Sequence, residues 1–237
     1  MRRCAMALII VLTTFASGAA HADGGRTGIE LGLRTGYALP FGDASSPTTS
    51  TSTTGGVTTV TTGGGSVDKL ITGQIPLWID AGYRIIPSVY VGGFFQYGFG
   101  FIGNDAKMVC GQAGASCSTH DIMFGLNAHY HFLPSEVLDP WAGIGFGYEF
   151  LGFGFSQGGM SADAQAEGWQ FVNAQVGADY HAAPGLGIGP FIALSFGQYK
   201  SASLSSGGSS QSQDIQHQSV HEWLTLGVRG AYDISIE

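Results

Sequence analysis

Four polar residues could do chemistry together, because each follows a tyrosine near the end of a segment that alternates apolar and polar residues. They are Arg84, His131, His181 and Asp233. The same polar faces also carry, slightly earlier in each segment, Asp80, His129, Asp179 and Arg229. Imidazoles grouped with carboxylates can bind a transition metal or relay protons. The alternative is a structural plug of ion pairs, because buried charges must pair whether or not they function. We expect the plug, with no metal and no cofactor.

The segment Ile122–Phe132 shows how such residues are positioned. Its even positions are all apolar, whereas its odd positions include Asn127, His129 and His131. A strict period of two is typical of a β-strand with unlike faces. The uncharged apolar face would pack against a core in a soluble sheet, or face lipid in a membrane barrel.

The same alternation predicts eight strands along the chain. The expected strands are Thr27–Pro40, Leu70–Ile85, Val89–Phe101, Ile122–Phe132, Trp141–Leu151, Trp169–His181, Ile188–Tyr199 and Val220–Ile236. Their polar faces add Glu30, Arg34 and Glu149 to the residues named above. The connections 41–69, 102–120, 152–168 and 200–219 are expected to be long polar loops, and short turns join the strands between them. Connections sorted in this way are typical of an outer-membrane barrel with long loops outside the cell and tight turns in the periplasm.

Tyrosines recur at fixed positions in this pattern. Tyr83, Tyr130, Tyr180 and Tyr232 end alternate strands, are separated by about 50 residues, and have outward parity. Amphipathic rings at one height are typical of an aromatic girdle at a membrane interface. A second girdle is expected at the opposite strand ends, from Tyr37, Tyr97 and Tyr148. Tyr199 has inward parity and joins this girdle only if Gly197 marks a β-bulge.

Composition favours the membrane interpretation. Only 11% of residues are charged and 39 of 237 are glycine, whereas a typical soluble domain has about 25% charged residues. The net charge of −8 argues against a nucleic-acid partner. Residues 1–22 have the basic start, apolar run and Ala-x-Ala end of a secretory signal peptide, which leaves residues 23–237 as one barrel domain. Cys110 and Cys117 then predict a disulfide, because an exported chain reaches an oxidising compartment.

The opening segment Ile29–Tyr37 and the eight alternating segments resemble the small eight-stranded outer-membrane proteins of Gram-negative bacteria, namely the OmpA transmembrane-domain, OmpX and OmpW-like barrels. The resemblance implies an all-β, eight-stranded antiparallel up-and-down transmembrane β-barrel, with four long extracellular loops and three short periplasmic turns. It also implies a monomer in outer-membrane lipid, inserted by the barrel-assembly machinery. One departure is the C-terminus, which ends in Glu237 where such proteins usually end in an aromatic residue.

Three functions are open at this point. The first is a non-catalytic structural or cell-surface role, in which loops such as Ser45–Ser66 and Ser201–Ser219 meet a surface ligand. The second is a narrow barrel that binds or passes a small hydrophobic ligand. Its slot would be formed where inward glycines meet large rings, namely Trp78, Phe94, Trp141 and Trp223, although these rings could instead pack against the glycines.

The third function is a lipid A-modifying enzyme that uses His120 and Glu149 near the outer rim. No serine lies at a suitable offset from these two residues, and neither a Gly-x-Ser-x-Gly nor a His-Glu-x-x-His motif occurs. We therefore expect a protein that is not an enzyme.

Overall fold

The computed structural model describes residues 27–43, 48–54, 57–63, 66–104, 107 and 110–235. The expected signal peptide, residues 1–22, and the C-terminal Ile236 and Glu237 lie outside the described residues. The elements are β1 (Gly28–Gly42), β2 (Thr48–Thr54), β3 (Val57–Gly63), α1 (Val67–Leu70), β4 (Ile71–Ile86), β5 (Val89–Ile102), β6 (Ala115–His131), β7 (Leu138–Gln157), β8 (Met160–Ala183), β9 (Leu186–Ser206), β10 (Ser209–Asp214) and β11 (Val220–Ser235).

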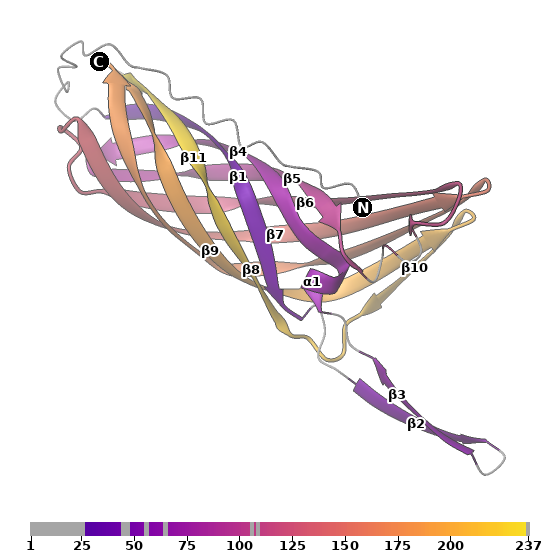
Figure 1. Cartoon of the computed structure of the whole chain (residues 1–237). Coiled ribbons are helices and arrows are strands. Elements are labelled where there is room, and N and C mark those ends of the chain that lie inside the picture. The colour runs from indigo at the N-terminus through magenta and orange to yellow at the C-terminus, as the bar shows by residue number, and fades with distance from the viewer. Residues whose placement is uncertain are drawn as a thin grey trace, which may run out of the picture.

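Within the described residues, eight of these strands form a closed antiparallel barrel (Figure 1). Strands β4 to β9 pair in chain order, β11 pairs with β9, and β1 lies between β11 and β4. Closure leaves no open edge in the wall, which is what a strand protein needs in lipid. The predicted fold class, an eight-stranded up-and-down barrel, is confirmed. No helix in the described part of the chain is long and apolar enough to cross a membrane.

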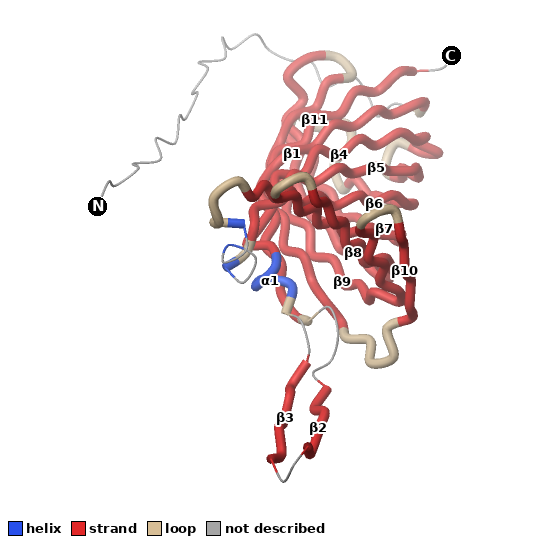
Figure 2. The backbone as a smooth tube through the Cα atoms, turned by 90° about the vertical axis from the view of Figure 1, so that its right-hand side faces the viewer, coloured by secondary structure: helices blue, strands red, loops and turns tan. Residues whose placement is uncertain are grey.

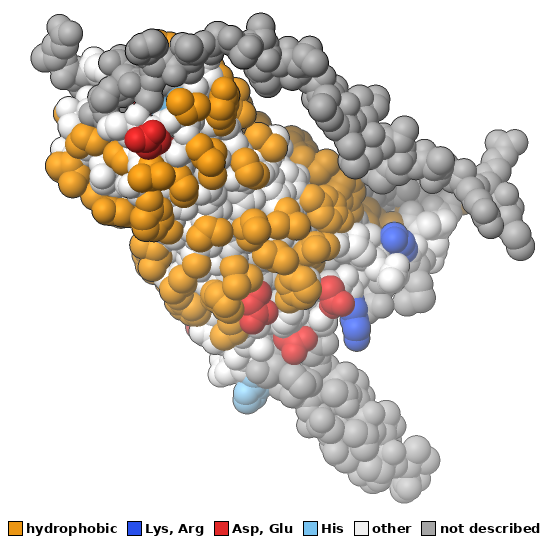
Figure 3. Space-filling model, turned by 60° about the vertical axis from the view of Figure 1, so that its left-hand side comes forward, with side chains coloured by type: hydrophobic (Ala, Val, Ile, Leu, Met, Phe, Trp, Pro, Cys, Tyr) orange, Lys and Arg blue, Asp and Glu red, His pale blue; other side chains and the backbone are white. Residues whose placement is uncertain are grey.

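The two faces of the wall follow directly from the alternation. In β1, Ile29, Leu31 and Leu33 are exposed on the outside, whereas Glu30 and Arg34 are buried in the lumen. The other barrel strands repeat this arrangement, and Figure 3 shows hydrophobic side chains spread over the wall with charged side chains at its margins. A charge near the bilayer midplane would cost about 2–4 kcal/mol. The outer surface therefore suits hydrocarbon.

Short turns join the strands at one end of the barrel, at residues 87–88, 132–137 and 184–185. The other end carries the long connections, but these are more ordered than expected. β7 continues to Gln157, β8 begins at Met160, and β9 continues to Ser206 before it pairs with β10. The expectation of loops over 152–168 and 200–219 is therefore wrong for most of both segments. A strand can continue without alternating apolar residues where an adjacent strand hydrogen-bonds to its backbone N–H and C=O groups.

Glycine pairs make these hairpins possible. Gly158 and Gly159 join β7 to β8 with φ of +60° and +83°, and Gly207 and Gly208 join β9 to β10 in the same conformation. Two-residue turns with positive φ at both positions match the twist of paired strands, and glycine adopts them without a Cβ penalty. These strands therefore extend well beyond the ends that the sequence predicts.

The segment 41–69 is also not a plain loop. It contains the β2–β3 hairpin, which projects away from the barrel (Figures 1 and 2), and the one-turn helix α1. Val67 of α1 is fully buried in a cluster with Ile71 and Leu151. A single apolar side chain thus brings the end of this connection into the mouth of the barrel.

Candidate functional site

The lumen contains a polar network near the end with short turns, which we call the periplasmic network. Arg34 is at its centre. Its Nε and Nη2 donate to the two carboxylate oxygens of Asp80 at 2.7 and 2.9 Å, and its Nη1 donates to Gln175. Asn127 Nδ2 also donates to Asp80 Oδ1 at 2.6 Å. Because Arg34 and Asp80 are both fully buried, neither charge could stay there without the other.

A second group of ion pairs lies beside the first. Glu30 accepts from Arg84 Nε at 2.6 Å and from Arg229 Nη2, and Arg229 also donates to Asp179. Asp233 lies 3.1 Å from Arg84 Nε. The predicted inward residues of β1, β4, β8 and β11 are therefore brought together by ion pairs in the lumen.

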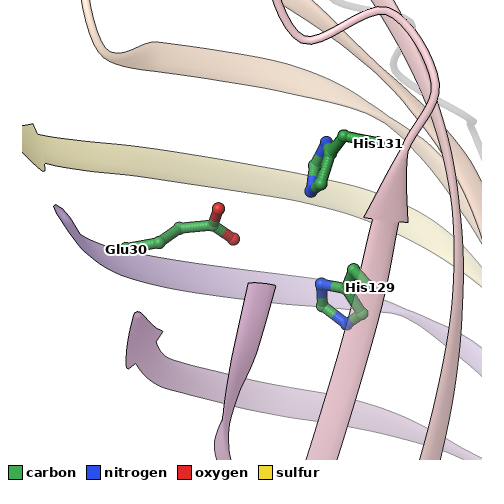
Figure 4. A group of neighbouring side chains, drawn as sticks. All are labelled: Glu30, His129 and His131. Carbon is green, nitrogen blue, oxygen red and sulfur yellow. The ribbon is translucent and has the colours of Figure 1, made fainter. Parts of the chain in front are cut away.

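The histidines complete this network. His131 Nδ1 lies 2.7 Å from Asp139 Oδ2, and His129 Nε2 lies 3.1 Å from Arg34 Nη2. Figure 4 shows Glu30 reaching from β1 towards the two rings on β6, and one ligand atom from each of Glu30, His129 and His131 lies within 4.8 Å of the others. His181 is only partly buried, at the edge of the network.

Sequence reasoning missed Asp139, because 133–140 was expected to be a turn. In the structure β7 begins at Leu138, and Asp139 is fully buried. Trp141 has inward parity in the expected strand Trp141–Leu151, and Asp139 lies two residues before it. Extending that strand towards the N-terminus would therefore have placed Asp139 in the lumen.

A separate polar cluster, the upper network, lies closer to the long hairpins. Glu149 Oε1 accepts from Tyr199 Oη at 2.6 Å and from Trp223 Nε1 at 3.1 Å, and its Oε2 lies 3.0 Å from His221 Nε2. Asp121 Oδ2 accepts from Gln74 and Gln96. Of the charged residues here, only Glu149 was predicted.

The parity of their own strands was the signal that could have found His221 and Asp121, because odd positions face inwards both in Val220–Ile236 and in Ile122–Phe132. Tyr199 has inward parity, as read from the sequence, and no register shift interrupts β9 beside Gly197 in its pairing with β11. Tyr199 therefore belongs to the lumen and not to the girdle.

Large rings fill the space between the two networks. Along β4 the inward residues include, in this order, Gln74, Trp78 and Asp80, so Trp78 separates the upper network from the periplasmic one. It packs with Phe94 at 5.2 Å between ring centroids, and the Arg34 guanidinium lies 4.6 Å above it.

Inward glycines make room for these rings. A Cβ at Gly177 would lie 2.6 Å from Trp141, and one at Gly147 would lie 3.1 Å from Phe94. At this level the rings pack against the bare backbone of the inward glycines and do not line a slot. This is the alternative to a ligand slot that the sequence analysis left open.

Above the upper network, the lumen holds an apolar pocket of about 160 Å³. Its lining includes Ile71, Thr119, Leu151, Phe153, Ala164 and Ala166. Leu151 lies opposite Asp121 in the pairing of β6 with β7, so the upper network is the floor of the pocket. The sequence did not predict this pocket, because it treated residues after Leu151 as a loop without faces.

The remaining predicted residues lie outside the lumen. The girdle tyrosines face outwards, and each is exposed or half-exposed: Tyr37, Tyr83, Tyr97, Tyr130, Tyr148, Tyr180 and Tyr232. Cys110 and Cys117 form a disulfide, which attaches the connection after β5 to the start of β6.

The enzymatic pair of the sequence analysis is not assembled. His120 has outward parity and stacks on Tyr97 at 6.0 Å between ring centroids, whereas Glu149 is buried in the lumen. These two side chains lie on opposite sides of the wall and cannot share a substrate.

Comparison with known proteins agrees with this architecture. Residues 79–237, more than half of the chain, match the autotransporter beta-domain family. A comparison with curated proteins gives no significant match. Among solved structures, a major outer membrane protein of Thermus thermophilus aligns with a TM-score of 0.50 at 12% identity, covering 87% of this chain and 99% of that one.

Two further structures align less closely. Neisserial surface protein A has a TM-score of 0.44 at 16% identity, and OprG of Pseudomonas aeruginosa has a TM-score of 0.44 at 12% identity. Each alignment covers 89% of this chain and 99% of the other chain. Together, the closed ring of strands, its apolar exterior and the match over residues 79–237 show that this chain is a small outer-membrane β-barrel that belongs to the autotransporter beta-domain family.

Proposed function

We propose that this chain is a non-catalytic barrel of the bacterial outer membrane that presents surface hairpins and does not conduct ions. The observation that carries the proposal is the filled lumen. Ion pairs such as Arg34–Asp80 in the periplasmic network close the lumen at the end with short turns. The upper network around Glu149 closes it nearer the long hairpins. An eight-stranded barrel has room inside only for side chains or one small ligand, and here the side chains take most of that room.

Planar-bilayer recording tests the closed lumen. The folded barrel is reconstituted without its signal peptide, and a trimeric porin in the same lipid is the positive control. We expect no conductance steps from this chain, since the charges that could line a pore are paired with one another. Stable, reproducible single-channel steps would overturn the proposal.

The surface role is supported by free strand edges beyond the barrel. β2 and β3 pair only with each other, and β10 pairs only with β9, among the described residues. The sequences of β2, β3 and β10 contain no lysine, arginine or proline, which are the residues that usually protect exposed edges. Such edges can add an extended polypeptide as a further strand. In this proposal the barrel is a monomer in outer-membrane lipid, inserted by the assembly machinery, and the partner reaches it at the hairpins.

A sedimentation assay tests strand pairing between cells. Cells that display the full chain are compared with cells that display a variant lacking residues 48–63, at equal amounts of folded barrel. We expect the full chain to make suspended cells settle faster, because edges on neighbouring cells can pair. Equal settling would rule out pairing between copies of this hairpin.

A second function is favoured by the apolar pocket above the upper network. Its volume of about 160 Å³ is close to that of apolar cavities that admit a benzene-sized molecule, about 150 Å³. The pocket would hold a small hydrophobic compound at the outer end of the lumen.

Fluorobenzene is a suitable probe in nanodiscs. We expect a saturable ¹⁹F shift with the wild type, loss of this shift in Leu151→Trp, and retention in the lipid-facing control Leu126→Trp. A shift of equal size in all three proteins would reflect lipid partitioning and would exclude the pocket.

A lipid A-modifying activity receives no support from the arrangement of His120 and Glu149 on opposite sides of the wall. Mass spectra of lipid A from cells that express the wild type and His120→Ala are expected to be identical. A modification present only with the wild type would contradict the non-catalytic assignment.

A further inference from the structure

We propose that Glu30, His129 and His131 bind a divalent transition-metal ion of the Zn²⁺ class at the periplasmic end of the lumen. The three side chains come from β1 and β6, and one ligand atom from each lies within 4.8 Å of the others (Figure 4). All three residues are buried. Two imidazoles and a carboxylate form a ligand set that is typical of zinc and related metals.

His131 is oriented as a metal ligand. Its Nδ1 lies 2.7 Å from Asp139 Oδ2, and the backbone N–H of Leu133 donates to Asp139 Oδ1 at 3.1 Å. An ionised carboxylate can only accept, so a neutral His131 has its proton on Nδ1 and its lone pair on Nε2. A carboxylate that fixes the tautomer of a ligand histidine is a common support in metal sites.

The lone pair of His131 takes part in no hydrogen bond within the part of the chain that the structure describes. His131 Nε2 is buried and has no hydrogen-bond partner among the described residues. A buried polar atom without a partner needs an explanation, and an ion that accepts a lone pair would supply one for His131.

The charges of the periplasmic network also leave room for a divalent ion. Its buried or half-buried carboxylates are Glu30, Asp80, Asp139, Asp179 and Asp233, and its guanidinium groups are Arg34, Arg84 and Arg229. With neutral imidazoles the network therefore carries a formal excess of two negative charges. One divalent ion would neutralise this excess in a place where uncompensated charge is costly.

Glu30 and His129 already accept hydrogen bonds from arginines, and metal binding must either keep or replace each of these bonds. Glu30 already accepts from Arg84 and Arg229, but a carboxylate has about four acceptor sites and can also bind an ion. His129 Nε2 accepts from Arg34 Nη2 at 3.1 Å. The ion would replace this contact, and Arg34 would keep both of its bonds to Asp80.

Binding of Zn²⁺ to the untagged, folded barrel in detergent tests the proposal. After treatment with a chelator, competition with a chromophoric zinc indicator should give one site per chain. His131→Gln should abolish this site, and Asp139→Asn should weaken it by about 10- to 100-fold. His120→Gln is the matched control, because His120 lies on the outer face of the same strand.

Three results would overturn the site: the wild type binds no Zn²⁺, His131→Gln binds Zn²⁺ as tightly as the wild type, or His120→Gln loses Zn²⁺ binding. Each variant is first checked for the heat-dependent change in gel migration that marks a folded barrel.

The wild-type complex with Co²⁺ decides the question if His131→Gln does not fold. X-ray absorption that shows two imidazoles in the first shell supports the site, whereas a shell of oxygen atoms alone overturns it.

Discussion

Replacing Arg34 with methionine tests the ion-paired plug most directly. The substitution keeps an unbranched apolar stem of similar length but removes the guanidinium group. Asp80 then loses the donors at 2.7 and 2.9 Å and, among the described residues, keeps only Asn127 as a side-chain partner. Removing one partner of a buried ion pair costs about 3–5 kcal/mol, because the other charge remains buried and uncompensated.

The double variant Arg34→Met/Asp80→Asn isolates the cause of this loss. Once Asp80 is replaced by a neutral amide, no uncompensated carboxylate remains, and Asn127 can still donate to the amide oxygen. Replacing both partners of a buried pair is often close to neutral. The double variant should therefore be more stable than Arg34→Met, although it contains one more substitution.

Urea-induced unfolding of the barrel in phospholipid vesicles, followed by tryptophan fluorescence with a chelator present, measures both effects. Lys107→Met is the matched control, because Lys107 is exposed in the connection after β5 and its removal should change little. An Arg34→Met variant as stable as the wild type would refute the plug. A double variant less stable than Arg34→Met would refute the argument from uncompensated charge.

Three further predictions concern other parts of the barrel and use the same unfolding assay. Leu126 is exposed on the outer wall between the tyrosine girdles, so Leu126→Arg should cost about 2–4 kcal/mol; an unchanged midpoint would contradict a lipid-facing wall. Tyr199→Phe removes the 2.6 Å donor to Glu149 and should cost about 1–3 kcal/mol; no loss would mean that Glu149 is satisfied without it. Reduction of the Cys110–Cys117 disulfide should cost about 2–3 kcal/mol; Cys110→Ser should match the reduced wild type and be insensitive to reductant.

The amino-acid sequence by itself determined which side of the wall each strand residue occupies. Side chains alternate along a strand, so a lipid-facing series such as Ile29, Leu31 and Leu33 places Glu30 and Arg34 in the lumen whatever the rest of the fold does. The same parity placed Tyr199 inside, and the recurring girdle tyrosines indicated the number of strands.

Parity alone misjudged parts of some strands and several connections. In β8 the pairing with β9 shifts between Gln170 and Val172, and both Phe171 and Val172 are exposed. Strict alternation cannot hold across such a β-bulge. Likewise, the polar segments beyond the membrane continue as strands because a neighbouring strand is present, which no local pattern reveals.

Only the tertiary structure decided which inward residues meet. Arg34 and Asp80 are 46 residues apart, and Arg229 and Glu30 are brought together by the pairing of β11 with β1 that closes the barrel. Partners across a lumen depend on the register and closure of all strands at once, so no single segment specifies them. For the same reason the sequence showed two histidines on one strand, whereas the fold placed Glu30 beside them and Asp139 behind His131.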